Sequence, residues 1–492
     1  MGTKQILAKL LVILLASLTV AEASLDRLTV KSAYVNKGES KYEKPRIKPG
    51  PKAKALHSLQ IYALTHPDGF LGKLLIPLYS NIGGIVSNAD SAHKQRLMFG
   101  NNFVYCGEVC LSGFSDVAHA ITTPQARTFR LGRTPHAPRR MPKGVGGRNI
   151  WMLSLSQKGA GGDGTHEALR KSMEDHIIGA DALKRQKDPV AQLIVHQLLV
   201  DYKAMTRVQR KGWLGRNKKI VTNEKFLTDN WLMFWTRYMH YCLFGINPLD
   251  ETKINVIRNF FYKSNKPLAV LYYATLVGPL VGLLTGTPKG IKKVTKIYEE
   301  SPALATFLEA QGENPIQKNE LAKAMIPIMV IAGMVGPMTL AGTSLGFVPL
   351  AEHQFAKKKI DVTKVWDKID LDSKTEVEQY IYECGRLDQP VSATHRVATE
   401  PFTVKIGGRD RTFPTGTTVN IPIGLSMVNE DFWGDTTYEF DHKRENLCPF
   451  SMIFHSVGTV TNGRVCPGKY LAMNLITDLV VGMGKIRREL LN

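Results

Sequence analysis

Apolar residues recur at helical spacing through most of the chain between residues 165 and 386, which predicts a series of helices there. Short β-prone stretches bounded by turn residues follow, and we expect strands at residues 402–406, 412–413 and 417–421. A helical pattern returns at residues 469–491, directly behind a turn that contains a cysteine. This order of elements predicts a mainly α protein with a small β region.

Two long runs, residues 267–288 and 324–351, carry no charge. Their length alone makes either a candidate for a membrane span. The second run, however, contains Pro327 and Pro337 and several glycines, and a helix wrapped by other helices shows the same all-round apolarity. We therefore favour a buried core helix over a membrane span.

The N-terminus has the pattern of a targeting signal. Lys4 precedes an apolar stretch, and Ala21-Glu22-Ala23 has the small-x-small form of a signal-peptidase site. Residues 1–23 are thus interpreted as a cleaved signal peptide, with a retained N-terminal anchor as the alternative. A basic leader containing Pro and Gly covers residues 24–56, and residues 57–492 are expected to form one domain. This organisation favours the endomembrane system or secretory pathway, with membrane association left open.

The composition narrows the functional classes. Hydrophobic residues make up 43% of the 492 residues, which excludes wholesale disorder, and six cysteines are too few for a disulfide-stapled scaffold. The net charge of +21 favours anionic ligands or surfaces. Residues 117–162 contain several arginines and no acidic residue, which suits either a carboxylate-binding site or a solvated loop. The segment has few aromatic residues for base stacking, so we do not expect it to bind nucleic acid. Cys106 and Cys110 lack partners at metal-ligand spacing, so we expect a disulfide or free thiols rather than zinc.

The most informative turn is Gly463-Arg464-Val465-Cys466-Pro467-Gly468, which immediately precedes the C-terminal helix. A cysteine at the N-terminus of a helix meets the positive end of the helix dipole, which stabilises the thiolate. A thiolate of this kind can be the axial ligand of a haem iron, although a Cys-Pro-Gly turn alone also suits a buried structural cysteine.

Further upstream, Glu383 and Arg386 are three residues apart, so on a helix they share a face and can pair. Arg444, in the segment Phe440-Asp441-His442-Lys443-Arg444, is placed to complete a charged triad. Pro390 and Arg396 lie between these two motifs. Each motif alone is compatible with an ordinary surface ion pair.

The ordered set resembles the cytochrome P450 superfamily: a Glu-x-x-Arg helix, a downstream Pro and Arg, a Phe-x-x-x-Arg loop and a cysteine turn before Leu471-Ala472. The resemblance implies a cytochrome P450 fold, a single large domain with haem b (iron protoporphyrin IX) buried between a central helix and the cysteine loop. It also implies that Cys466 ligates the iron and that Glu383, Arg386 and Arg444 form a structural core. The residues similar to the haem-propionate contacts of the family are His166, Arg170, Arg396 and Arg464. For the first two, a solvated helix face is the alternative.

The central helix departs from the family pattern. In oxygen-activating members this helix carries an acid followed by Thr, which relay protons during oxygen activation. The corresponding distal residues here are Ala332, Gly333, Val335 and Gly336. Val335 and Gly336 occupy the acid and hydroxyl positions, and neither side chain can donate a proton. Thr339 or Thr343 would have to substitute from one or two turns further along.

The cysteine loop departs as well. Phe454 and Gly458 lie further from Cys466 than is usual, because residues 459–462 extend the loop. This extended loop resembles the cysteine loops of the branch that contains allene oxide synthases, hydroperoxide lyases and epoxyalcohol synthases. Members of that branch usually carry Asn where Ala332 falls, so this match is incomplete.

These features lead to the hypothesis of a haem-thiolate enzyme that converts fatty-acid hydroperoxides by homolytic O–O cleavage to epoxyalcohols, allene oxides or aldehydes, without O2 or NADPH. Its partner would be a lipid hydroperoxide or another lipophilic small molecule, and no redox partner would be required. The alternatives are a reductase-dependent P450 monooxygenase acting on a lipophilic substrate and a non-catalytic haem-binding protein.

Overall fold

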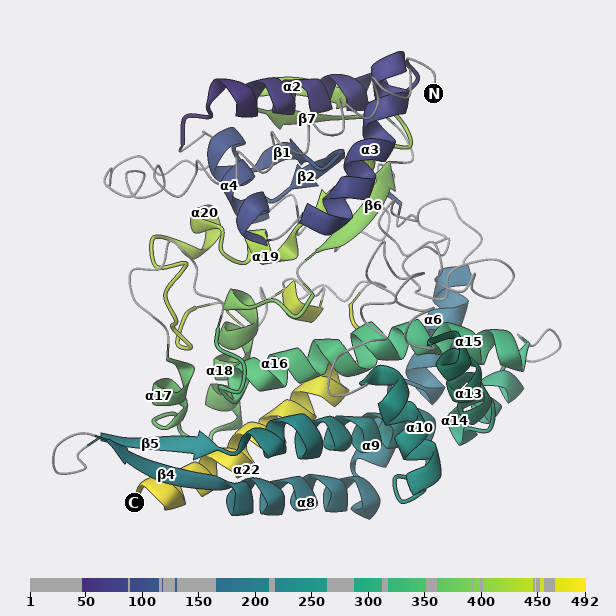
Figure 1. The fold of residues 1–492 in the computed structure, drawn as a ribbon, viewed down its shortest axis with the longest axis vertical. Coiled ribbons are helices and arrows are strands. Elements are labelled where there is room, and N and C mark those ends of the chain that lie inside the picture. Colours follow the sequence, from purple (N-terminus) through teal and green to yellow (C-terminus); the bar gives the residue numbers. More distant parts are fainter. Residues whose placement is uncertain are drawn as a thin grey trace, which may run out of the picture. The chain divides into compact units, whose positions relative to one another are not determined.

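The computed structural model describes residues 47–86, 89–114, 117, 129–130, 165–211, 217–262, 287–311, 317–350, 361–391, 393–398, 401–445, 447, 452–454 and 465–492. Within these residues the chain forms two compact units (Figure 1). Unit 1 combines the N-terminal elements with residues 393–438. Unit 2 holds most of the helices and the C-terminal segment.

Unit 1 is built on a five-stranded sheet with the strand order β1-β2-β9-β6-β3. These strands are β1 (Asn102–Tyr105), β2 (Glu108–Leu111), β3 (Phe129–Arg130), β6 (Thr394–Ala398) and β9 (Thr418–Ile421). A separate hairpin is formed by β7 (Phe402–Ile406) and β8 (Arg409–Phe413). The described helices of this unit are α2 (Pro51–Thr65), α3 (Phe70–Val86), α4 (Ala89–Phe99), α19 (Ile423–Ser426) and α20 (Glu430–Trp433).

The three expected strands are confirmed, but the hairpin of β1 and β2 was not predicted. Its turn places Cys106 and Gly107 at positive φ, 52° and 75°, as a two-residue hairpin turn with mirror-image geometry requires. Strand β2 then runs parallel to β9, with Val109 opposite Val419. The late strands are thereby completed by a hairpin about 300 residues earlier in the chain, a pairing that local sequence patterns do not reveal.

The leader also contains structure that was not expected. Helix α2 begins at Pro51, inside residues 24–56, the segment interpreted as a basic leader. Proline suits the first position of a helix because its φ is already helical and its missing N–H would have no partner there. The N–H of Ile47 donates to the carbonyl of Leu97, which ties the residues before α2 to the end of α4.

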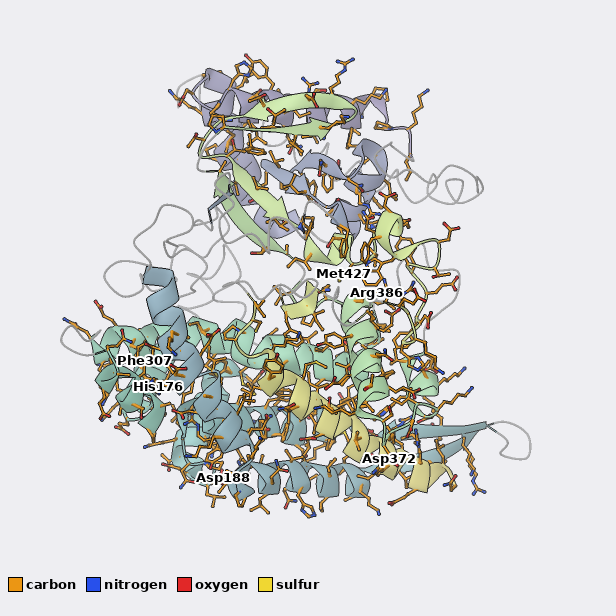
Figure 2. All side chains as sticks on the ribbon, turned by 180° about the vertical axis from the view of Figure 1, so that it is seen from behind. His176, Asp188, Phe307, Asp372, Arg386 and Met427 are labelled. Atoms are coloured by element: carbon orange, nitrogen blue, oxygen red, sulfur yellow. The ribbon has the colours of Figure 1, made fainter. Side chains whose placement is uncertain are left out.

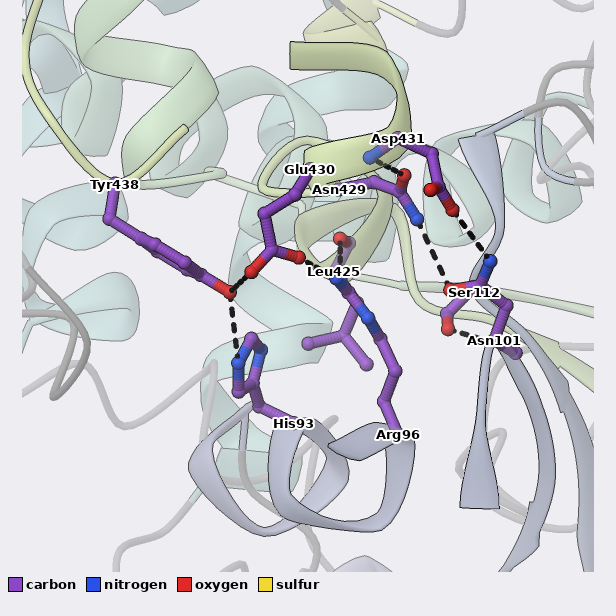
Figure 3. Close-up of polar contacts among 9 residues, drawn as sticks. All are labelled: His93, Arg96, Asn101, Ser112, Leu425, Asn429, Glu430, Asp431 and Tyr438. Atoms are coloured by element: carbon purple, nitrogen blue, oxygen red, sulfur yellow. Dashed lines mark hydrogen bonds and ion pairs between the residues drawn. The ribbon is translucent and has the colours of Figure 1, made fainter. Parts of the chain in front are cut away.

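A buried polar cluster joins α4 to the segment from α19 to Tyr438 in unit 1 (Figure 3). Arg96 donates to the carbonyl of Leu425 at 2.8 Å and to Glu430 Oε2 at 2.6 Å. The hydroxyl of Tyr438 lies 3.0 Å from Glu430 Oε1 and 3.2 Å from His93 Nε2. All four of these polar residues are at most 6% exposed. The carboxylate of Glu430 is therefore buried, with Arg96 and Tyr438 among its hydrogen-bond partners.

The described residues of unit 2 form helices and one hairpin. Its α-helices are α6 (Thr165–His176), α7 (Ala180–Gln186), α8 (Pro189–Met205), α9 (Trp231–Phe244), α10 (Glu251–Phe261), α13 (Thr287–Glu299), α14 (Pro302–Glu309), α15 (Lys318–Ile328), α16 (Gly336–Ser344), α17 (Val362–Trp366), α18 (Lys374–Leu387) and α22 (Lys469–Leu491). Two π-helices, η5 (Phe226–Asn230) and η6 (Met329–Val335), and the 3₁₀ turn η7 (Met452–Phe454) complete the helical part. Helix α22 has the predicted bounds and packs against α16 and α18.

Helix ends in unit 2 follow local chemistry. The hydroxyl of Ser373 accepts a hydrogen bond from the N–H of Glu376, which begins α18. Helix α9 ends at Gly245, whose φ of 68° is left-handed, and the N–H of Gly245 donates to the carbonyl of Tyr241. Glycine allows this conformation at little cost.

Residues 324–344 of the uncharged run form a largely buried helical path from α15 through η6 to α16, as predicted. Met325, Met329, Met334 and Ala341 are fully buried along it. Within the residues that the structure describes, no helix has both the length and the apolarity for crossing a membrane. Residues 267–286 of the other run lie outside the described part.

The hairpin of β4 (Thr206–Lys211) and β5 (Asn217–Thr222) was not predicted within the mainly helical stretch between residues 165 and 386. Its strands are rich in Lys and Arg and lack the regular alternation of apolar and polar residues that would have indicated them. The register places Arg210 directly opposite Lys218, and the ammonium group of Lys218 donates to the carbonyl of Leu491 at the end of α22.

Three segments of unit 2 converge on Gly385 in α18. A Cβ built on this glycine would lie 3.0 Å from Leu340 Cδ1 of α16 and 2.9 Å from Ile453 Cγ2 of η7. Such distances are closer than two carbon atoms normally approach. Glycine is thus required for α18 to contact the central helix and the segment that leads to the cysteine turn.

Replacing Arg96 with Met should destabilise unit 1, because the buried Glu430 carboxylate loses its charged partner. We expect a loss of about 3–5 kcal/mol in the free energy of unfolding, measured by urea denaturation. The double variant Arg96→Met, Glu430→Gln should recover part of this loss. As a control, Arg207→Met on an exposed strand position should change stability by less than about 0.5 kcal/mol. Equal effects of the two single variants would contradict the role of the cluster.

Replacing Gly385 with Ala should lower the melting temperature, although Gly→Ala in a helix normally stabilises by up to about 1 kcal/mol. The added methyl group would overpack the contact with Leu340 and Ile453, at a cost of about 1–3 kcal/mol. Gly342→Ala in α16 is the matched control, because its nearest neighbour is a methyl group of Val348, a side chain that is 42% exposed and free to move. If both variants were equally stable, the close approach at Gly385 would be refuted.

Candidate haem-thiolate site

An ion pair occupies the C-terminal end of α18 (Figure 2 labels Arg386). The guanidinium of Arg386 donates to both carboxylate oxygens of Glu383, at 2.6 and 2.8 Å, and both side chains are fully buried. The three-residue spacing on a helix brings the two groups onto one face. This two-pronged geometry satisfies the carboxylate in a region that excludes water.

Residues 439–444 wrap around this pair. The N–H of Asp441 donates to Glu383 Oε1 at 3.0 Å, and the carbonyl of Glu439 accepts from the guanidinium groups of Arg386 and Arg444. Arg444 Nε lies 3.7 Å from Glu383 Oε1, so the structure brings together all three residues of the expected core. Burial and the neighbouring Arg386 guanidinium lower the pKa of Arg444 from its ordinary value.

Cys466 lies in the turn directly before α22. Its N–H donates to the carbonyl of Phe454 at 2.8 Å, and its own carbonyl accepts from the N–H of Lys469 at 3.2 Å. These bonds fix the turn between η7 and the first residue of α22. The thiol is free and half-buried, and the N-terminus of α22 presents the positive end of a helix dipole that favours a thiolate.

The other described cysteines have a different environment. Cys110, Cys242 and Cys384 are buried, and Cys106 lies in the turn of the β1–β2 hairpin. Burial raises the pKa of both the Cys106 and the Cys242 thiol to about 12, which keeps them protonated near neutral pH. Cys106 and Cys110 are free thiols, which is one of the two states expected for them. Among the described residues no group of potential metal ligands occurs.

The central helix changes to a π-helix at η6, over the residues that were assigned to the distal site. Pro337, the second residue of α16, cannot donate to the carbonyl of Gly333, and Pro327 lies two residues before η6. Helices commonly relax into a π turn where an i→i−4 bond is lost, and such turns are frequent at functional sites. This π-helix was not predicted, although the two prolines ten residues apart are a sequence signal for it.

The four residues assigned to the distal site lie in η6 and at the start of α16, and none of them has an ionisable side chain. Ala332 is exposed, Val335 is half-buried, and Gly333 and Gly336 are buried. A Cβ on Gly333 would lie 2.6 Å from the sulfur of Met329, so the glycine lets that fully buried side chain pack against the helix.

The two threonines considered as substitutes differ in environment. Thr343 is fully buried, and its hydroxyl donates to Asp388 Oδ2 at 3.1 Å, which commits this proton to a structural bond. Thr339 is half-buried and lies one turn beyond Val335. Of the two, Thr339 is the more available hydroxyl.

The surroundings of Cys466 fit the haem that the sequence resemblance implies. Gly468 has no side chain, and a Cβ there would lie 3.8 Å from Cys466 Sγ and 3.3 Å from Ile178 Cγ2. The glycine therefore avoids a tight contact with Ile178 and places no side chain against the sulfur, which suits an iron ligand. Cys466 would hold the iron through its thiolate.

The residues assigned to the propionates are located only in part. His166 and Arg170 lie one turn apart on α6, and Arg396 lies on β6. Their side chains, and all of Arg464, lie outside the described part of the structure, as do residues 455–464 of the extended loop. Their contacts with haem remain predictions.

Neither a protein-family model nor a curated protein sequence matches this chain. Solved structures do match. The P450 heme domain of Tepidiphilus thermophilus has a TM-score of 0.54 at 13% identity, covering 81% of this chain and 87% of that chain. Cytochrome P450 TbtJ1 gives 0.52 at 15% identity, with 78% and 85% covered. P450BioI, solved in complex with hexadec-9Z-enoic acid ligated acyl carrier protein, gives 0.51 at 15% identity, with 77% and 84% covered.

These structures agree with the arrangement of helices and small sheets described above, and with the fold expected from the Glu-x-x-Arg helix and the cysteine turn. The chain has the cytochrome P450 fold.

Proposed function

We propose that this protein is a haem-thiolate enzyme that converts fatty-acid hydroperoxides by homolytic O–O cleavage, without O2 or NADPH. The observation that carries the proposal is the chemistry of the central helix. From Met329 to Gly336, across all of η6, no side chain can donate or accept a proton.

Oxygen activation by reductive chemistry needs protons delivered to the reacting oxygen atoms, whereas a hydroperoxide brings both oxygen atoms already reduced. Bound haem would supply the iron that accepts one oxygen in O–O homolysis, with the Cys466 thiolate as its ligand. The remaining work falls to the protein, which must orient a lipid and exclude water.

The central helix suits that work. Met329 and Met334 are fully buried, and the exposed Ala332 offers only a methyl group. An apolar wall holds a carbon radical away from water, so that the outcome depends on the geometry of the bound chain. Hydroxyl rebound after rearrangement gives an epoxyalcohol, proton loss gives an allene oxide, and chain cleavage gives aldehydes.

A long acyl chain is the substrate class that we assign. P450BioI, which shares the fold, is solved with an acyl carrier protein carrying hexadec-9Z-enoic acid, so the fold accommodates an acyl chain. The net charge of +21 favours a carboxylated ligand. Because Ala332 stands where members of the hydroperoxide-converting branch usually carry Asn, the central helix offers the peroxide no side-chain amide at this position.

A second candidate is a reductase-dependent monooxygenase. The half-buried hydroxyl of Thr339 favours it, because this group is close in sequence to the π-helix and is not bonded to Asp388 as Thr343 is. In that reaction Thr339 would have to move a proton that no residue of η6 can provide.

The two candidates respond differently to Thr339→Val. The purified, haem-loaded protein should consume linoleate hydroperoxide without reductant, and Thr339→Val should change the rate less than about 2-fold, because no proton relay is used. A general acid normally contributes about 10²–10⁴-fold, so a loss of that size, or consumption that requires NADPH and a reductase, would establish the monooxygenase. Absence of turnover under both conditions would indicate a haem-binding protein.

Cys466→Ser should abolish the thiolate-type Soret band of the ferrous carbon monoxide complex, because a serine hydroxyl does not replace the thiolate donor. The absorbance difference spectrum measures this directly. Cys106→Ser is the control, since that thiol is half-buried but lies in unit 1, in the turn of the β1–β2 hairpin. An unchanged spectrum in Cys466→Ser would refute the assignment of the iron ligand.

A further inference from the structure

The hairpin of β4 and β5 concentrates positive charge at one edge of unit 2. Between residues 203 and 225 the sequence has eight Lys or Arg residues and a single acidic residue, Glu224. Arg207, Arg210 and Lys219 are exposed, and none of them has an ion pair or side-chain hydrogen bond to another described residue. The hairpin therefore carries positive charge that the rest of the described chain does not balance.

The charges of the hairpin also repel one another. The register places Arg210 directly opposite Lys218, and like charges at such positions destabilise a hairpin. Lys218 donates to the backbone carbonyl of Leu491, which leaves its charge without an acidic partner among the described residues. By contrast, Lys203 of the adjacent helix α8 pairs with Glu489 at 2.7 Å. A negatively charged surface lying against the hairpin would relieve this repulsion.

Helix α8, which leads directly into β4, adds exposed aliphatic side chains to the same edge of unit 2 (Figures 1 and 2). Leu193 is 61% exposed and Val200 is 46% exposed. They are seven residues apart, so they lie on one face of the helix, two turns from each other. Lys203 is the neighbour of Val200 on the helix surface, because it follows three residues later. Exposed aliphatic groups and cations thus adjoin along this edge.

Both faces of the hairpin carry cations. Alternate residues of a strand point to opposite faces, so the register puts Arg207 and Lys219 on one face and Arg210 and Lys218 on the other. A folded partner protein contacts one face of a hairpin, whereas a layer of lipid headgroups can surround its end. Charge on both faces therefore favours a lipid surface over an acidic protein.

The exposed side chains of α8 favour lipid over nucleic acid. Aliphatic side chains next to cations enter the boundary between headgroups and acyl chains, as in helices that lie on a membrane. Proteins that bind single-stranded nucleic acid instead stack aromatic side chains on the bases. The exposed large apolar residues of α8 are Leu193 and Val200, and neither can stack in this way.

We propose that the β4–β5 hairpin and the outer face of α8 bind a bilayer that contains anionic phospholipid. The cations of the hairpin lie among the headgroups, and the aliphatic side chains of α8 lie at the edge of the acyl chains. None of these residues belongs to η6 or to the cysteine turn, so the proposal does not rest on the proposed reaction. An enzyme bound in this way would meet a lipophilic substrate where such molecules concentrate.

Vesicle binding tests the role of the charges. The haem-loaded full chain is sedimented with vesicles of phosphatidylcholine alone or mixed with phosphatidylserine, and the ratio of the two partition coefficients is measured. The double variant Arg210→Gln, Lys219→Gln should lower this ratio about 25-fold, since each cation at an anionic bilayer contributes about 5-fold.

The control is Lys292→Gln, Lys296→Gln, which changes the net charge equally. Both lysines are exposed on α13, which Figure 1 shows at the opposite end of unit 2 from the hairpin. The ratio should change less than about 2-fold in this variant, because the attraction falls off within a Debye length of the bilayer. Equal losses in the two double variants would overturn the proposal, as would a wild type without preference for phosphatidylserine.

Leu193→Gln tests the apolar part of the surface. Binding to the anionic vesicles should fall about 5-fold, because an aliphatic side chain no longer leaves water. Leu249→Gln is the matched control, since Leu249 is 73% exposed in the turn between α9 and α10 and should have no effect. Equal effects of the two leucine variants would contradict a bilayer contact through α8.

Binding of a DNA duplex separates lipid from nucleic acid. A loss of DNA binding in Arg210→Gln, Lys219→Gln with unchanged vesicle binding would assign the hairpin to nucleic acid and overturn the proposal. Consumption of linoleate hydroperoxide is measured without vesicles, so failure of the proposed reaction and failure of bilayer binding are distinguished.

Discussion

The carboxylate of Glu383 is fully buried, and the arrangement of unit 2 around it follows from the need to satisfy that charge. Arg386 donates to both of its oxygens, and the N–H of Asp441 donates to one of them. Burying an ion pair costs about as much desolvation free energy as the pairing returns, so the pair adds little net stability. It does specify a geometry, because any arrangement that separates these groups leaves a charge buried without a partner. We infer that this requirement fixes residues 439–444 against the end of α18.

The candidate site is positioned through the same helix. Gly385 lies between Glu383 and Arg386, and its lack of a side chain lets α18 contact Leu340 of α16 and Ile453 of η7. The N–H of Cys466 in turn bonds to the last residue of η7. A structural ion pair, a central helix and a cysteine turn are thereby held together in one unit. In this frame the thiol of Cys466 is the candidate iron ligand, and the π-helix η6 contributes only apolar side chains.

The parts of the fold that were predictable are those encoded locally. The bounds of α22 and the strands β7 and β9 follow from periodicity and turn residues, and the Glu383–Arg386 pair follows from a three-residue spacing on a helix. The β1–β2 hairpin was missed because its sheet is completed by strands far along the chain. The cluster of His93 with Tyr438 was missed for the same reason, since 345 residues separate its members. The π-helix had a local signal in Pro327 and Pro337, but prolines alone do not say how a helix accommodates them.

The most direct measurement for the central claim is the origin of the oxygen in the product. Linoleate hydroperoxide labelled with ¹⁸O in both peroxide positions is incubated with the haem-loaded protein in ordinary air, and the products are analysed by mass spectrometry. The account predicts that the epoxide, hydroxyl or aldehyde oxygen of the product carries the label, because it comes from the peroxide and the Met329–Gly336 stretch provides no proton for activating O2. Product oxygen that comes from air, and that depends on an added electron donor, would contradict it.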